Sequence, residues 1–186
     1  MNLKFFQSTL KSLRTIWPNI GRVWITLGVM ALFGIVGWSL GAYRASDEAR
    51  HALLSDDQVA VIRSDGYWSF IPHAGSSPRT VGLVFFAGAL VEPAAYAPLA
   101  GAVARRGFPT LLVELPRRGA FGGADGPEVI ERARAAMRKL PDVTRWIIAG
   151  HSRGGAVAAR FVRESTSAVA ALVLVATSHP RDFSLA

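Results

Sequence analysis

The sequence contains no cysteine among its 186 residues. This absence excludes disulfide bonds, thiolate metal sites and a cysteine nucleophile. Cysteine content therefore gives no information on whether the protein works in an oxidising or a reducing compartment. Nucleophilic chemistry, if the chain performs it, must come from another residue type.

Acidic residues are scarce: 13 Asp and Glu stand against 21 Lys and Arg, a formal net charge of +8. Residues 1–43 hold four of the basic residues and none of the acidic ones, so residues 44–186 carry 17 minus 13, or +4. This excess suits contact with anionic lipid headgroups, but no nucleic-acid recognition motif accompanies it. We therefore expect the lipid bilayer as a partner and no nucleic acid.

Charge is missing altogether from Val23–Tyr43, a run of 21 residues. At about 1.5 Å per residue, a helix of this length spans about 31 Å, the thickness of one hydrocarbon layer. Trp24 and Trp38 near its ends, with Arg22 and Arg44 just outside, are typical of interfacial anchoring. The run predicts one transmembrane helix over residues 23–43.

The flanking segments are interpreted accordingly. Residues 1–22 form a basic leader, either an interfacial amphipathic helix ending near Pro18 or a flexible segment. Residues 44–57 are charged and rich in small residues, which is typical of a juxtamembrane stalk. A cleaved signal peptide, with its cleavage site within 41–45, is the alternative; the long leader and the long apolar run favour an uncleaved anchor.

The basic residues also predict the orientation. Four precede the apolar run without an acidic neighbour: Lys4, Lys11, Arg14 and Arg22. Arg44 and Arg50 follow it, mixed with Asp47 and Glu48. By the positive-inside rule the N-terminus lies in the cytoplasm and the remainder of the chain on the outer side of the membrane.

From residue 58 onward, apolar strand patterns alternate with helix patterns. Asp65-Gly66 separates two β-rich runs and indicates a hairpin. Near-continuous apolar strands alternating with helices predict an α/β fold, a mostly parallel sheet with helices on both faces. The expected strands are 58–63, 67–72, 80–86, 110–115, 144–149 and 170–176, and the expected helices are 97–106, 127–139 and 155–163.

One motif indicates chemistry, the G-x-S-x-G pattern of Gly150–Gly154. It lies between an expected buried strand and an expected helix, the arrangement of a nucleophile elbow. Ser152 is therefore the candidate nucleophile. The alternative is a glycine-rich turn from strand to helix in which the serine is incidental.

An acyl-transfer site also needs backbone N–H groups that bind the oxyanion. One is expected from Arg153, the residue after the serine, and others from the loop after strand 80–86, where Gly88 and Ala89 lie. The loop 116–126 follows the next strand, at the sheet edge where such folds bind ligands. Its Arg117 and Arg118 are candidates for an anionic substrate group, or are simply solvated.

The histidines fit a catalytic role less well. His151 lies inside the motif, where a packing role is expected, and His51 and His73 precede the first parallel strand. His179 and Asp182 follow the last expected strand, in the order histidine then acid. A serine hydrolase of this architecture has the order serine, acid, histidine.

These residues resemble the α/β-hydrolase superfamily, in particular its compact, bacterial, membrane-anchored members of the dienelactone-hydrolase-like type. The resemblance covers Val81–Ala186 and rests on three stretches: Phe85–Ala100, Gly150–Gly155 and Ala176–Asp182. It implies a core over 58–186 with a nucleophilic Ser152 and oxyanion amides at Gly88, Ala89 and Arg153. The implied reaction is hydrolysis of a small-molecule carboxylic ester or related acyl bond through an acyl-enzyme, without metal or organic cofactor.

The chain departs from the family pattern at its end. The family sheet continues for two further strands that bring the acid and the histidine, whereas this sequence matches the first six strands. Asp182 is either an acid placed early or a polar residue in a loop after the strand. The sequence is then part of a longer product, a shortened inactive version, or an enzyme whose base is supplied otherwise.

Three functions follow from the sequence. The first is a membrane-anchored serine hydrolase. The second is a membrane-tethered binding domain that has kept the fold and lost the base. The third is an acyltransferase that uses the same acyl-serine and passes the acyl group to an acceptor other than water. Substrate and oligomeric state cannot be derived from the residues, because loops line the pocket.

Overall fold

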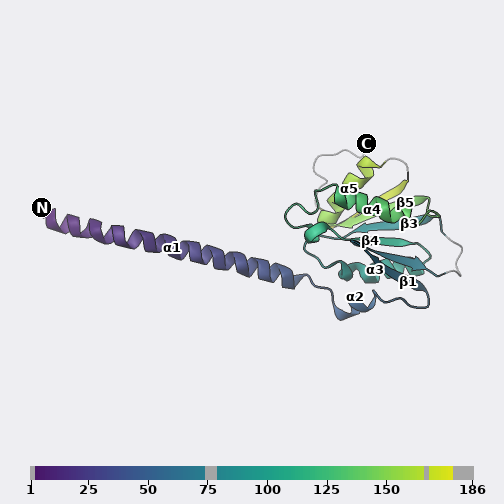
Figure 1. Cartoon of the computed structure of the whole chain (residues 1–186), viewed down its shortest axis with the longest axis horizontal. Coiled ribbons are helices and arrows are strands. Elements are labelled where there is room, and N and C mark those ends of the chain that lie inside the picture. The colour runs from purple at the N-terminus through teal and green to yellow at the C-terminus, as the bar shows by residue number, and fades with distance from the viewer. Residues whose placement is uncertain (1–2, 74–78, 166–167, 178–186) are drawn as a thin grey trace. The chain divides into compact units, whose positions relative to one another are not determined.

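The computed structural model describes residues 3–73, 79–165 and 168–177. The chain divides into two compact units, Met1–Ala42 and Tyr43–Ala186. The first consists of one helix and the second of a sheet with helices on both faces (Figure 1).

Helix α1 (Leu3–Ala42) is 40 residues long. Within it, Ile20–Trp38 is long and apolar enough to cross a membrane, and none of this stretch is buried. This property is shared by membrane anchors and signal sequences. The helix also continues through Pro18, contrary to the end expected there. Proline lacks one backbone donor, so a helix that passes through it loses a single hydrogen bond while the turns on both sides keep theirs.

The second unit is built on a six-stranded sheet in the order β1-β2-β4-β3-β5-β6. The hairpin of β1 and β2 is antiparallel, and β2 pairs antiparallel with β4. All other pairings, β4 with β3, β3 with β5 and β5 with β6, are parallel. The strands are β1 (Val59–Ser64), β2 (Tyr67–Pro72), β3 (Val81–Phe86), β4 (Thr110–Val113), β5 (Arg145–His151) and β6 (Val169–Val175).

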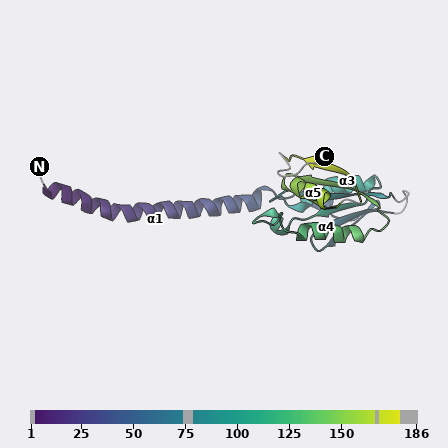
Figure 2. The ribbon, with the colours of Figure 1, turned by 90° about the horizontal axis from the view of Figure 1, so that it is seen from above.

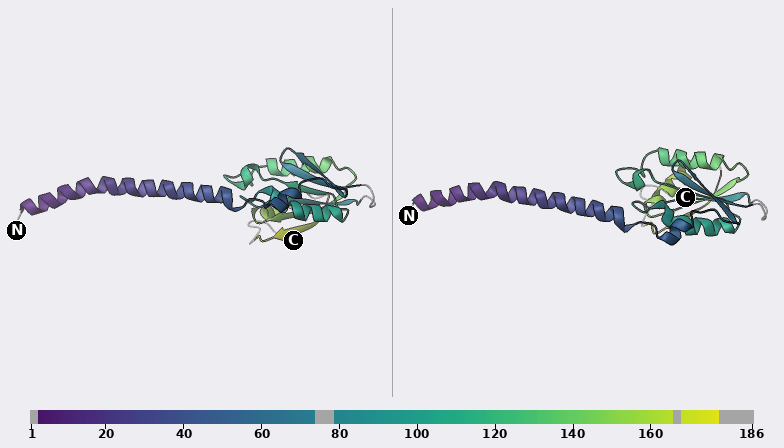
Figure 3. Two further views of the ribbon diagram at one scale, coloured as in Figure 1. Left: turned by 90° about the horizontal axis from the view of Figure 1, so that it is seen from below. Right: turned by 60° about the horizontal axis from the view of Figure 1, so that its bottom comes forward.

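Helices cover both faces of this sheet, as the sequence predicted. Helix α3 (Ala97–Arg105) lies on one face, and α4 (Glu128–Arg138) and α5 (Arg153–Glu164) lie on the other. Figure 2 shows α3 and α4 on opposite sides of the sheet, and the views in Figure 3 agree. The mostly parallel α/β fold expected from the sequence is thus confirmed.

The sheet packs against a separate core cluster on each face, because successive side chains along a strand point to opposite faces. Val84 and Phe86 of β3 pack beneath α4 and α5, whereas Phe85 packs beneath α3. The positions of α3 in the same cluster as Phe85 are all alanine: Ala97, Ala100 and Ala104. Small residues let this helix approach the sheet closely.

Residues 44–57, expected as a stalk, contribute to the folded unit. They contain the short helix α2 (Asp47–His51), whose Ala49 is buried with Ala45 and Ala94. Ala94 belongs to a 3₁₀ turn, η1 (Pro93–Tyr96), that leads into α3. A second 3₁₀ turn, η2 (Pro116–Gly119), follows β4. Neither turn is predicted by hydrophobic periodicity.

One carboxylate joins the start of β1 to the end of α3. Asp56 Oδ1 accepts the N–H groups of Gln58 and Val59 at 2.9 and 2.8 Å, and Oδ2 pairs with Arg105 at 2.5 Å. The hydrogen bond from Arg105, followed by these two N–H groups, lowers the Asp56 pKa from 3.8 to about 2.

We predict that Asp56→Asn destabilises the folded unit in a pH-dependent way. Because the folded pKa lies below the unfolded one, the carboxylate stabilises the fold fully above pH 3.8, and this contribution is lost as the pH falls through about 2. Urea unfolding of the full chain in detergent should give a lower midpoint for the variant at pH 6, and the two midpoints should converge only below the folded pKa, at about pH 1. The matched control is Asp57→Asn, at an exposed position with no described hydrogen bond. Equal effects of the two substitutions would contradict the prediction.

Candidate active site

Ser152 lies at a strained turn between β5 and α5, which we call the Ser152 turn (residues 150–154). Its backbone angles are φ 51° and ψ −119°, a combination rarely adopted by a residue with a Cβ. The Ser152 N–H donates to the Val175 carbonyl at 2.9 Å, and the Thr177 hydroxyl donates to the Ser152 carbonyl at 2.9 Å. These bonds hold the strained backbone from β6 and the residues after it, and they leave the serine exposed.

The glycines of the Ser152 turn are required by close packing. A Cβ on Gly150 would overlap the Gly154 carbonyl, and a Cβ on Gly154 would overlap the carbonyls of Phe86 and Ala87. The first turn of α5 therefore lies directly against the end of β3. This approach brings the loop after β3 beside the serine.

Two backbone amides near this contact are available to a ligand. Arg153 begins α5, where the first N–H groups of a helix lack partners within the helix. Among the residues that the structure describes, no hydrogen bond is formed by the Ala89 N–H. The N–H of the next residue, Leu90, donates to the Arg118 carbonyl at 2.7 Å and so fixes the loop.

Gly88 lies in the same loop but is already engaged. Its N–H donates to the Tyr96 hydroxyl at 3.1 Å, and that hydroxyl lies 2.8 Å from Nδ1 of His151. Burial raises the pKa of the Tyr96 phenol, which keeps it neutral and able to donate and accept. The sequence did not assign Tyr96 a role, because hydroxyl, imidazole and amide meet only when β3, η1 and β5 come together.

The loop between η2 and α4 is bound to the first turns of α5. The Arg153 guanidinium forms an ion pair with Asp125. Arg160 donates to the carbonyls of Asp125 and Gly126 at 2.6 and 2.9 Å. Arg118, expected as a substrate ligand, donates to the carbonyls of Leu90 and Tyr43 and is therefore used within the fold.

The sequence offered Asp182 as a candidate acid and assigned no base. His179 and Asp182 lie outside the described residues. Within the described part of the chain, no imidazole or carboxylate forms a hydrogen bond with Ser152 Oγ, and no group of three or more His, Asp or Glu is arranged to hold a metal ion. His73 bonds the Asp56 carbonyl at 3.1 Å, and His51 is exposed on α2.

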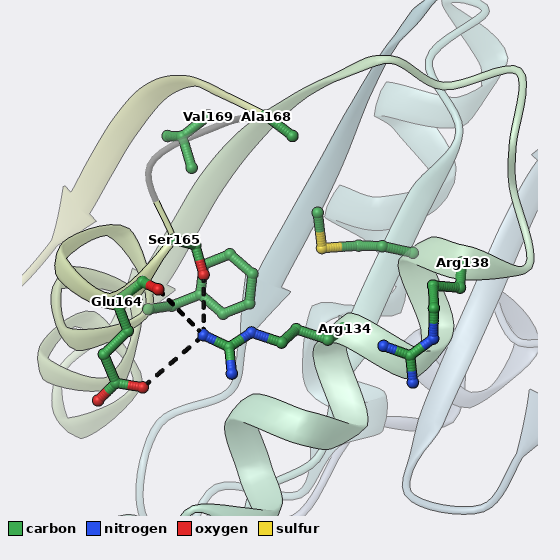
Figure 4. Close-up of a pocket in the computed structure, with 8 residues that line it drawn as sticks. Arg134, Arg138, Glu164, Ser165, Ala168 and Val169 are labelled. Atoms are coloured by element: carbon green, nitrogen blue, oxygen red, sulfur yellow. Dashed lines mark hydrogen bonds and ion pairs between the residues drawn. The ribbon is translucent and has the colours of Figure 1, made fainter.

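A surface cavity of about 470 Å³ lies elsewhere, between α4, the C-terminal end of α5 and the residues that follow α5 (Figure 4). Arg134 crosses it toward the opposite wall, where it donates to the Glu164 carbonyl at 3.2 Å and to Ser165 Oγ at 3.1 Å (Figure 4). Ser165 directly follows the C-terminal end of α5, whereas Ser152 precedes its N-terminal end. This cavity is therefore separate from the Ser152 turn, and Arg134, which crosses it, already has protein partners.

Comparison with known proteins gives a family and several related folds. Residues 82–186 match the model of the Alpha/beta hydrolase family. No match is found among the curated proteins.

Among solved structures, the chain is similar to a bacterial heroin esterase, with 26% identity and a TM-score of 0.52, covering 68% of this chain and 47% of that one. It is similar to an ester-hydrolase from the metagenome of Lake Arreo, with 16% identity and a TM-score of 0.51, covering 70% of this chain and 49% of that one. It is also similar to the HSL-homolog EstE7 from a metagenome library, with 15% identity and a TM-score of 0.50, covering 75% and 53%. The chain spans about half the length of these structures.

We predict that Gly154→Ala destabilises the folded unit by about 2–3 kcal/mol, because the new methyl group meets two backbone carbonyls that no side-chain rotation can move. The matched control is Gly101→Ala in α3, where the methyl group would meet only the guanidinium of Arg105 and helix propensity improves by up to about 1 kcal/mol. Denaturant unfolding of the full chain in detergent measures both. An unchanged midpoint for Gly154→Ala would show that α5 and β3 are not in close contact.

Proposed function

Because the chain belongs to the alpha/beta hydrolase family, we propose that it is a serine hydrolase that cleaves a carboxylic ester or related acyl bond, with Ser152 as the nucleophile. The observation that carries this proposal is the exposed serine at φ 51° and ψ −119°, between a buried strand and the start of a helix. This is the geometry that a nucleophile elbow requires. The similarity to the bacterial heroin esterase supports an ester as the substrate class.

In the proposed reaction, Ser152 Oγ attacks the acyl carbonyl and the alcohol leaves, which produces an acyl-serine that water then hydrolyses. The N–H groups of Arg153 and Ala89 stabilise the oxyanion, with the positive end of the α5 dipole behind Arg153. Gly88, the third expected donor, would first have to release Tyr96. The substrate fits beside the loop after β3, which Leu90 and Arg118 fix in place.

The serine needs a base to accept its proton. We propose Asp182 as the acid and assign no base, because His179 and Asp182 follow each other in the order opposite to that of the family.

We predict that Ser152→Ala lowers kcat for a short p-nitrophenyl ester by a factor on the order of 10⁶, the typical loss for a missing nucleophile. The matched control is Ser165→Ala at the other end of α5, which should leave turnover unchanged. Colorimetric assay of the full chain in detergent measures both variants. Turnover by Ser152→Ala equal to that of the wild type would refute the proposal.

The second candidate is a binding domain with this fold but without catalysis. The observation that favours it is that no described imidazole or carboxylate bonds Ser152 Oγ. An unactivated serine reacts poorly, so this alternative expects no covalent labelling of the folded chain by a fluorophosphonate probe. Labelling of the wild type and not of Ser152→Ala would exclude it. Identification of the acyl acceptor would distinguish hydrolysis from acyl transfer.

We further propose that α1 is an uncleaved membrane anchor with its N-terminus in the cytoplasm and the hydrolase unit outside. Since the chain has no cysteine, a single cysteine introduced at exposed Ser55 can report the side of the membrane. A thiol reagent that does not cross membranes should label this variant in intact cells. Labelling only after the cells are broken would contradict the proposed orientation and place residue 55 in the cytoplasm.

A further inference from the structure

The loop that follows β4 exposes an aromatic side chain to an unusual degree. Phe121 is 89% exposed, the largest value among the large hydrophobic side chains that the structure describes, including those of α1. It lies in residues 116–123, which we call the Phe121 loop. This loop contains two arginines and no acidic residue, and Arg117 is exposed.

The Phe121 loop is held at both ends, so the exposure of Phe121 is a property of a fixed structure. At the first end, the Arg118 carbonyl accepts the Leu90 N–H at 2.7 Å and the Arg118 guanidinium bonds the Leu90 carbonyl. At the second end, Gly123 donates to the Ala120 carbonyl at 2.9 Å, and Arg160 holds the carbonyls of the residues that follow. The phenyl group is thus exposed to solvent on a loop whose conformation is fixed by hydrogen bonds to the rest of the fold.

The segment that follows α1 is bonded to this same region. The Tyr43 carbonyl accepts the Glu92 N–H at 2.8 Å and the Arg118 guanidinium at 3.4 Å. The Glu92 carboxylate accepts the Ala45 N–H at 2.9 Å and pairs with Arg50 at 2.8 Å. Residues 43–50 are therefore fixed to the loops after β3 and β4, at the carboxyl edge of the sheet.

Chain connectivity then limits how far these loops lie from a membrane. Tyr43 is five residues beyond Trp38, the last residue of the apolar stretch of α1. Five residues reach at most about 17 Å. Glu92 and Arg118 therefore stay within about 20 Å of the end of the apolar stretch, whatever the orientation of the two units.

The composition of the Phe121 loop suits a bilayer interface. An aromatic ring gains free energy in the boundary between headgroups and acyl chains, and arginine is attracted to anionic headgroups. The Phe121 loop is also connected to the Ser152 turn, because Asp125, two residues beyond the loop, forms an ion pair with Arg153.

We propose that the Phe121 loop contacts the bilayer that α1 enters, and that the substrate of Ser152 is an acyl ester of a membrane lipid. The second part rests on the proposed function. Ser152 Oγ takes the acyl group from the lipid, the lipid alcohol leaves with a proton, and one water releases a free fatty acid and restores the serine.

Membrane contact can be tested without any activity. Because the chain has no cysteine, the variant Phe121→Cys of the full chain can be labelled at that position alone with an environment-sensitive fluorophore. The matched control is Ile62→Cys, at an exposed apolar position on β1. Both are reconstituted in vesicles of phosphatidylethanolamine and phosphatidylglycerol that contain spin-labelled lipid. We expect quenching of the fluorophore at position 121 and none at position 62. No quenching at position 121, or equal quenching at both, overturns the contact.

The substrate class is tested with two esters, a fluorogenic diacyl phospholipid in the same vesicles and a soluble p-nitrophenyl ester. We expect Phe121→Ser to lower turnover of the vesicle ester about tenfold or more, as loss of an inserted aromatic side chain should. Turnover of the soluble ester should stay unchanged, and Ile62→Thr should change neither. Wild-type turnover of the soluble ester alone overturns the lipid substrate and leaves the proposed function intact. Turnover of neither ester overturns both.

Discussion

The close contact between the first turn of α5 and the end of β3 is the constraint on which the candidate site depends. It is possible only because Gly150 and Gly154 have no side chain where backbone carbonyls fill the space. The contact forces the residue between them into a conformation that costs on the order of 1–3 kcal/mol. The fold holds that strain with hydrogen bonds to Val175 and Thr177, and the result is an exposed serine between β5 and α5.

The loops around this serine are fixed by charged side chains bonded to backbone carbonyls. Arg118 joins the loop after β3 to the loop after β4 and to Tyr43, and Arg160 holds the residues before α4. Glycine-rich loops such as 116–126 are otherwise poor at keeping one shape, because glycine has the largest backbone entropy to lose. Arginine, with five donors in a planar group, can bind several carbonyls at once. The two arginines that the sequence suggested for substrate binding or solvation therefore have different environments. Arg118 is hydrogen-bonded within the fold, whereas Arg117 is exposed.

Much of the fold was predictable because it follows from short-range patterns. The six strands and the three main helices appear within a few residues of their expected positions, and the Asp65-Gly66 hairpin forms as expected. The G-x-S-x-G motif indicated the turn from strand to helix because glycine and serine spacing directly encodes its steric needs. The expected end of the first helix at Pro18 was wrong, since one lost hydrogen bond does not interrupt the helix. The short helix α2 and the two 3₁₀ turns were missed because each is too short to show a period.

The sequence by itself determined the α/β alternation, the mostly parallel sheet, the apolar helix and the residue at the strained turn, since each depends on neighbours within about one element of secondary structure. Only the tertiary structure decided that Tyr96 occupies the Gly88 amide and meets His151, and that Arg118 reaches Tyr43. Tyr96 and His151 lie 55 residues apart in the chain, and Tyr43 and Arg118 lie 75 residues apart. No periodicity or motif links positions so distant, because their proximity is set by strand order and by loop packing, and these are properties of the whole folded unit.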